Sequence, residues 1–243
     1  MRALSKSKLM AFRQCPRRLW LEVLHPELRE DSSTTQASFV AGHSVGDAAR
    51  RIYDPKNTGS MIDLKALGFP GAFVETSRLL PVGKPIFEAS FTIPGAMAMA
   101  DVLLPIGRGS SRRWRMIEVK SSTAIKDYHR DDAAIQSYVA RKSGLPLARI
   151  SVARIDSSWV YPGGDTYDGL LVEDDLTAET RAREKEVADW IAQSHALIGK
   201  RREPEISTGK HCSAPYECGF LGHCSSSEPV ADYPVSWLPR STK

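Results

Sequence analysis

The chain has 243 residues, of which 26% are charged and 42% are hydrophobic, and its formal net charge is +4. This length suits one well-cored domain, or one domain with a small appendage, and so mild a positive charge does not by itself indicate a nucleic-acid partner. No apolar run approaches the length of a membrane span, and the first residues lack the apolar core of a signal peptide. The sequence therefore predicts a cytoplasmic protein with no membrane partner.

The first part of the chain predicts helices. Residues 5–24 have apolar positions at helical spacing and Ser5 as a candidate N-cap, but Pro16 must end or kink this helix and leaves Cys15 at the bend. A second helix is expected over about residues 36–53, and a short one over about 71–80.

The middle of the chain predicts strands. Residues 85–91 alternate as a strand does, with Phe87, Ala89 and Phe91 on one face and Glu88 on the other. A β-hairpin follows over Met97–Lys120, with its turn at the Gly-rich residues 107–110. Because side chains alternate along a strand, Glu118 and Lys120 project from the same side, and Asp101 on the partner strand can point into the same space.

Two carboxylates and one ammonium at the end of a hairpin form a suitable site for a divalent cation over a phosphate. Mg²⁺ and Mn²⁺ take oxygen ligands, commonly one or two carboxylates with waters and substrate phosphate. Such an ion lowers the pKa of its water and neutralises charge on phosphoryl oxygens, and a nearby lysine can orient the attacking water. The alternative is that Lys120 only forms a surface ion pair with Glu118 or Asp101.

The remaining elements complete an α/β pattern. A polar stretch at 121–130 leads into a helix at about 131–142, a strand at 150–155, a candidate strand at 159–161 and a long helix at about 178–200. A helix that crosses over between neighbouring strands predicts a mixed central sheet flanked by helices. Residues 1–224 are expected to form a single domain, and residues 225–243 a loosely held tail.

The four cysteines suggest a metal centre. Cys212, Cys218 and Cys224 form a regular C-x₅-C-x₅-C run in an apolar-poor segment, residues 205–224, and Cys15 is the fourth. In a cytoplasmic chain, converging thiolates indicate metal ligands rather than disulfides, and four thiolates match the needs of a [4Fe–4S] cluster. Structural zinc with help from His25, His211 or His223 is an alternative, although no tight C-x₂₋₄-C pair is present, and unligated thiols are another.

Taken together, the motifs resemble the RecB-type nucleases of the PD-(D/E)XK superfamily, in the branch that carries an Fe–S cluster. That branch includes the CRISPR-associated adaptation nucleases and the nuclease domains of AddB-type helicase–nucleases. The resemblance covers about residues 5–224. It rests on the opening Ser5–Arg17, on His43, Asp101, Glu118-Val119-Lys120, Gln136 and Tyr138, and on one early and three late cysteines.

The resemblance implies a restriction-endonuclease-like core and a role for each matching residue. Asp101 and Glu118 would bind the divalent metal with the Val119 carbonyl, Lys120 would position or activate the attacking water, and His43 would be a further ligand. Glu88 would assist, and Arg17 is a candidate substrate contact within a basic N-terminal cluster. Gln136 and Tyr138 fall where the family has a Q-x-x-x-Y motif, but here the spacing is Gln-x-Tyr; if Tyr138 holds the Tyr place, Ala134 holds the Gln place.

The expected function is therefore that of a Mg²⁺- or Mn²⁺-dependent deoxyribonuclease. By resemblance its substrate is single-stranded DNA or a duplex end, cut exonucleolytically, in DNA repair, recombination or CRISPR-type processing. Two alternatives stay open. One is a non-catalytic Fe–S DNA-binding subunit that positions a partner helicase or integrase, and the other is a structure-selective endonuclease on the same core.

Overall fold

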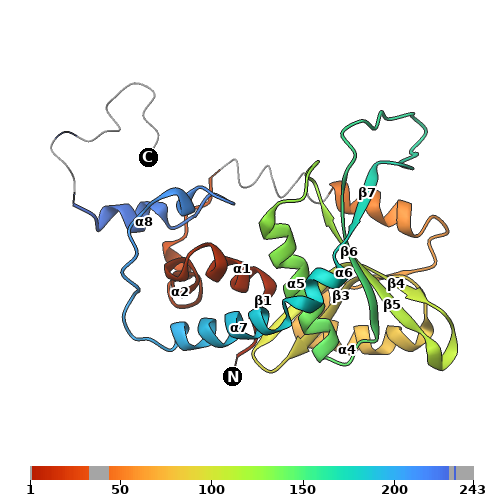
Figure 1. The fold of residues 1–243 in the computed structure, drawn as a ribbon, viewed down its shortest axis with the longest axis horizontal. Coiled ribbons are helices and arrows are strands. Elements are labelled where there is room, and N and C mark those ends of the chain that lie inside the picture. Colours follow the sequence, from red (N-terminus) through yellow and green to blue (C-terminus); the bar gives the residue numbers. More distant parts are fainter. Residues whose placement is uncertain (1, 33–43, 230–232, 234–243) are drawn as a thin grey trace.

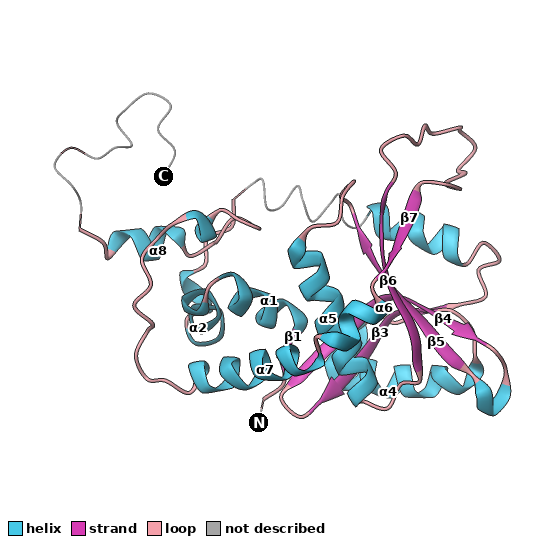
Figure 2. Ribbon diagram, in the orientation of Figure 1, coloured by secondary structure: helices cyan, strands magenta, loops and turns pink. Residues whose placement is uncertain are grey.

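The computed structural model describes residues 2–32, 44–229 and 233. It has a seven-stranded mixed sheet flanked by helices (Figures 1 and 2). The strand order is β2-β3-β4-β5-β6-β7, and β1 pairs with β4. The strands are β1 (Leu4–Ser5), β2 (Ser60–Met61), β3 (Ile86–Ile93), β4 (Ala96–Ile106), β5 (Arg113–Lys120), β6 (Leu147–Ile155) and β7 (Leu171–Asp175).

Three helices form two layers on one side of the sheet. Helix α5 contacts β4 and β6, while α1 and α7 contact α5, so that α5 lies between them and the sheet (Figure 1). The α-helices are α1 (Lys6–Gln14), α2 (Pro16–Leu24), residues 44–53, α4 (Leu64–Leu79), α5 (Asp127–Lys142), α6 (Thr177–Ala182), α7 (Glu184–Ile198) and α8 (Leu221–Ser226). Short 3₁₀ helices occur at Pro26–Leu28, Leu80–Val82, Gly109–Ser111 and Lys210–Cys212.

The central hairpin and the crossover helix have the predicted topology. β3, β4 and β5 form an antiparallel meander. α5 then carries the chain from β5 to the parallel neighbour β6, and β7 pairs antiparallel to β6. The predicted break at Cys15-Pro16 is also present, since α1 ends at Gln14 and α2 begins at Pro16.

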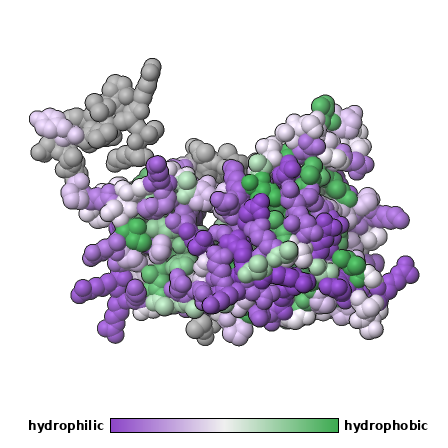
Figure 3. Space-filling model, in the orientation of Figure 1, coloured by the Kyte–Doolittle hydropathy of each residue, from purple (hydrophilic) through white to green (hydrophobic). Residues whose placement is uncertain are grey.

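Two apolar clusters cover the two faces of the sheet. The larger one joins the sheet to Leu9 of α1, Ile135 of α5 and Trp190 of α7. The smaller one, on the other face, consists of Phe87, Val102, Ile117 and Ala153. Hydrophilic side chains cover most of the face shown in Figure 3, where hydrophobic ones form only scattered patches. Among the described residues, no helix is both long enough and apolar enough to span a bilayer.

Several predicted boundaries were wrong for local reasons. α5 begins at Asp127, four residues before the predicted start, and α4 begins at Leu64 because Asp63 caps it by accepting hydrogen bonds from the Lys65 and Ala66 amides at 2.9 and 3.1 Å. The predicted helix at 178–200 is two helices that meet at Arg183. No strand forms at 159–161, whereas β7 was not predicted.

The predicted alternation along β3 fails at Glu88. This residue has φ +58°, a left-handed conformation uncommon outside glycine. Phe87 consequently lies in the smaller cluster, while Ala89 and Phe91 lie in the larger one on the opposite face. The prediction that these three side chains share a face is therefore wrong, and the irregularity occurs beside the candidate site.

Candidate active site

The site begins where β4 and β5 separate. Their pairing ends at Val102 and Ile117, so the Val119 amide has no main-chain partner in β4. The Asp101 side chain supplies one, because its Oδ2 accepts a hydrogen bond from the Val119 nitrogen at 2.7 Å. This contact fixes the Asp101 carboxylate beside the Glu118-Val119-Lys120 stretch, as the hairpin prediction required.

Glu118 is the centre of a buried ionic network. Its side chain is only 3% exposed, and the Lys120 Nζ lies 2.5 Å from its Oε1. Lys120 also forms an ion pair with Asp132, and Gln136 donates a hydrogen bond to the other Glu118 oxygen. Asp132 and Gln136 are four residues apart on α5 and therefore lie on the same face of the helix. Their contacts with Lys120 and Glu118 show that this face points toward the end of β5.

A second lysine, which the sequence analysis did not identify, completes this network. The Lys6 Nζ lies 3.0 Å from Glu118 Oε1 and 3.0 Å from Asp132 Oδ1. Lys6 is the first residue of α1, directly after β1, whose pairing with the start of β4 brings the helix to the sheet. No local pattern distinguishes Lys6 from other lysines, because its position depends on this long-range pairing.

The charges of the network leave a negative excess. Burial raises the pKa of Asp101, although Lys6 and Lys120 oppose this effect. Burial also raises the pKa of Glu88, and the Glu118 charge adds to it. With every group ionised, the four carboxylates outnumber the two ammonium groups by two charges. The carboxylates are Glu88, Asp101, Glu118 and Asp132, and the ammonium groups are Lys6 and Lys120.

Lys120 remains protonated in this environment. Burial alone would lower the pKa of its ammonium, but Asp132, Glu118 and Asp101 raise it well above the usual value. At neutral pH, Lys120 can therefore donate hydrogen bonds and stabilise negative charge, and it cannot accept a proton.

No ready-made three-ligand site surrounds this network. Within residues 2–32, 44–229 and 233, no three or more His, Cys, Asp or Glu side chains are arranged to hold one metal ion. The predicted ligand His43 lies outside the described residues. Asp101 and Glu118 nevertheless offer the oxygen donors that Mg²⁺ and Mn²⁺ use, and a Mg²⁺ site needs only one or two carboxylates when waters and phosphate complete it.

The other residues predicted to contact the substrate lie in different surroundings. Gln136 reaches Glu118, whereas Tyr138 packs partly buried against the larger apolar cluster, with Lys142 Nζ 5.6 Å from its ring centroid. Arg17 binds the late segment of the chain, because its guanidinium donates to Glu203 at 2.5 Å, to the Ile206 carbonyl at 3.0 Å and to Ser227 at 3.3 Å. We therefore leave Tyr138 and Arg17 out of the candidate site.

The four cysteines lie around one small cavity. Cys15, Cys212, Cys218 and Cys224 are each 8% exposed and line it together. Burial raises the pKa of Cys218, and it raises that of Cys224 to about 11, so unligated thiols would stay protonated there. The donor set matches a metal centre of four thiolates in number, but as placed here the four side chains are not arranged to hold one ion, so ligation would have to draw them together and release the thiol protons.

The histidines considered as zinc ligands have different surroundings. His211 lines the cysteine cavity. His223 contacts Glu203 at 3.2 Å, and His25 contacts Glu27 at 3.0 Å.

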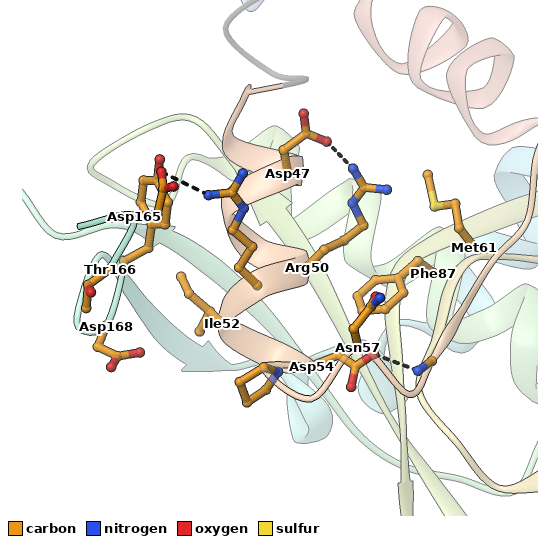
Figure 4. Close-up of a pocket in the computed structure, with 14 residues that line it drawn as sticks. Asp47, Arg50, Ile52, Asp54, Asn57, Met61, Phe87, Asp165, Thr166 and Asp168 are labelled. Carbon is orange, nitrogen blue, oxygen red and sulfur yellow. Dashed lines mark hydrogen bonds and ion pairs between the residues drawn. The ribbon is translucent and has the colours of Figure 1, made fainter. Parts of the chain in front are cut away.

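A larger cavity, of about 680 Å³, lies between residues 44–59 and the β6–β7 loop (Figure 4). Phe87 lines it, which places it near the smaller apolar cluster. Its two arginines are paired with carboxylates, Arg50 with Asp47 and Arg51 with Asp165. Its lining residues also include Asp54 and Asp168. Acidic residues thus outnumber basic ones, which does not suit phosphate binding.

Comparisons with known proteins give no family assignment. No family model matches the chain, and no curated protein does. A solved structure described as "Crystal structure of SSO0001" is similar, with a TM-score of 0.35 and 14% identity over 85% of this chain and 80% of that one. Similarity this low does not support an argument about activity.

Proposed function

We propose that the chain is a Mg²⁺- or Mn²⁺-dependent deoxyribonuclease with a restriction-endonuclease-like core, acting on single-stranded DNA or duplex ends. The observation that carries the proposal is the contact between Asp101 and the Val119 amide. It holds the Asp101 carboxylate against the end of β5 that also carries Glu118 and the protonated Lys120. That combination suits hydrolysis of a phosphodiester better than binding alone.

Asp101 and Glu118 would hold the metal ion, with the Val119 carbonyl and His43 as further ligands. The bound ion supplies a coordinated water of lowered pKa and neutralises charge on the phosphate. When all six groups are ionised, the excess of two negative charges in the network would favour a divalent cation over a monovalent one. Lys6 and Lys120 share Glu118 Oε1, and Lys6 is the more distant of the two, so a metal ion at Glu118 would compete with the Lys6 ammonium.

The protein side chains have separable tasks in this proposal. Lys120 donates hydrogen bonds that orient the attacking water and then stabilises charge on the phosphoryl oxygens. Gln136 holds the Glu118 carboxylate from the opposite oxygen, and Asp132 holds Lys120. Glu88, with its raised pKa, is a carboxylate that can accept the proton of the attacking water.

We also propose that the four cysteines hold a [4Fe–4S] cluster that joins the N-terminal and C-terminal segments and has no redox task. The four cysteines line one cavity, and the lack of a tight cysteine pair supports a cluster over zinc. Iron and sulfide analysis of anaerobically purified protein tests it. Stoichiometric zinc without iron would contradict it.

The test of the nuclease proposal is degradation of end-labelled single-stranded DNA with Mn²⁺. We expect Lys120→Ala and Asp101→Asn to lose at least a hundredfold in rate, because they remove charge stabilisation or a metal ligand. Lys65→Ala, at an exposed position on α4, is the matched control and should keep full activity.

Two results would refute this proposal. Equal activity of wild type and Lys120→Ala would exclude the mechanism. DNA binding in EDTA without cleavage under any metal would favour the non-catalytic subunit.

Circular single-stranded DNA separates the two nuclease modes, since a circle offers no end, and cleavage of it would indicate an endonuclease.

A further inference from the structure

An aromatic pair lies at the edge of the candidate site. Tyr128 is in the first turn of α5, and Tyr216 is in the cysteine-rich segment between Cys212 and Cys218. Their ring centroids are 4.9 Å apart at an interplanar angle of 64°. Figure 1 shows this late segment extending toward the N-terminal end of α5. Two distant parts of the chain thus build one small aromatic surface.

This surface continues the active-site face of α5. Tyr128, Asp132 and Gln136 are spaced four residues apart, so they follow one another along the same side of the helix. Asp132 pairs with Lys120, one turn from Tyr128. Partial burial raises the pKa of the Tyr216 hydroxyl, while the Lys120 charge lowers it, so this tyrosine also lies within electrostatic reach of Lys120.

The backbone of Tyr216 is held by a hydrogen bond, whereas the residue is partly exposed to solvent. The Gln14 side-chain amide donates hydrogen bonds to the carbonyls of His211 and Tyr216, both at 2.7 Å. The Tyr216 residue is still 49% exposed. In an edge-to-face pair the two ring planes do not cover one another, so the exposed part of Tyr216 can meet a ligand. A pre-positioned aromatic ring binds at low entropic cost, because little freedom remains to be lost.

We propose that Tyr216 and Tyr128 stack an unpaired base of the DNA strand next to the phosphate that would be bound through the metal ion at Asp101 and Glu118. This inference rests on the proposed nuclease function and specifies its substrate as single-stranded. Aromatic faces stack on any base, whereas the bases of an intact duplex are already stacked on their neighbours. Lys126, whose Nζ lies 5.8 Å from the Tyr128 ring centroid, supplies positive charge for the adjoining phosphate.

The experiment measures binding of a fluorescent oligothymidine by anisotropy, on full-length protein in EDTA, so that cleavage plays no part. We expect Tyr216→Ala to weaken binding about tenfold, within the range for loss of one base–aromatic stack, and Tyr216→Trp to retain it. Tyr161→Ala is the matched control, because Tyr161 is 50% exposed and also lies against other aromatic rings. It should bind as the wild type does.

A series of oligonucleotides, each with one abasic site at a different position, separates stacking from a structural effect. At the position that contacts Tyr216, removal of the base should weaken wild-type binding about tenfold and leave Tyr216→Ala unaffected. If Tyr216→Ala binds oligothymidine as tightly as wild type, or loses affinity equally for every abasic oligonucleotide, the stacking role is wrong. If wild type neither binds nor cuts DNA, the proposed function itself fails.

Discussion

Replacing Lys6 by methionine should destabilise the metal-free protein and tighten its binding of Mn²⁺. The Lys6 Nζ lies 3.0 Å from Glu118 Oε1 and from Asp132 Oδ1, where it neutralises carboxylates that are almost fully buried. Methionine keeps much of the side-chain length and removes the charge. The two effects have one cause, because the ammonium and the metal ion compete for Glu118.

The magnitude follows from these distances. At an effective dielectric constant near 20, each 3.0 Å contact is worth roughly 5 kcal/mol of attraction before the desolvation of the ammonium is subtracted. Lys120 still compensates both carboxylates in the variant, so we expect a net loss of about 2 kcal/mol. For a chain of this size that corresponds to a fall in Tm of roughly 4–8 °C. An equal gain in metal binding would be about thirtyfold.

The assay is thermal unfolding in EDTA and in a Mn²⁺ series, with calorimetric titration of Mn²⁺. Lys8→Met is the control, since Lys8 belongs to the same helix and pairs with Glu22 at 3.1 Å, a residue that Arg18 and Arg29 also hold. It should lose less stability and bind Mn²⁺ as the wild type does. Unchanged or weaker Mn²⁺ binding by Lys6→Met would refute the competition.

Three further predictions concern acid stability and the cysteine region. Burial and the Lys120 charge lower the pKa of His129 to about 4, so the unfolded chain binds more protons than the folded one between pH 6.5 and 4. The free energy of unfolding should therefore fall by up to roughly 3 kcal/mol as the pH is lowered through that window. His129→Asn should flatten this dependence in urea titrations. Arg17→Gln should lower Tm by several degrees and leave the DNA affinity of the folded protein unchanged, because its contacts are all internal. Cys224→Ser should abolish the visible absorption of anaerobically purified protein, and an unaltered spectrum would exclude Cys224 as a cluster ligand.

The sequence was sufficient to predict the hairpin and to place Asp101 beside the Glu118-Val119-Lys120 stretch. Both strands alternate over their length and a Gly-rich turn joins them, so the register and the facing side chains follow from local pattern. The break at Cys15-Pro16 was predictable for a similar reason, because proline cannot continue a helix with an intact hydrogen-bond ladder.

The helical half of the site was not predictable in the same way. Gln136 and Tyr138 were both expected at the site, but residues two apart on a helix point about 200° from one another, so one face cannot present both. The face that meets Glu118 contains Asp132 and Gln136 instead. Placing the start of α5 at residue 131 also left Tyr128 in a loop, and its position on that face was lost.

Helix α1 connects the candidate active site to the cysteine region. Lys6 at its first turn contacts Glu118, while Gln14 at its last residue holds the backbone of the cysteine-rich segment, next to Cys15. Nine residues of α-helix span only about 13 Å. A metal centre at the cysteines would therefore fix one end of a rigid element whose other end sets the charge at Glu118, and the same segment positions Tyr216. Loss of that centre should alter metal and DNA binding even though no cysteine touches the proposed substrate.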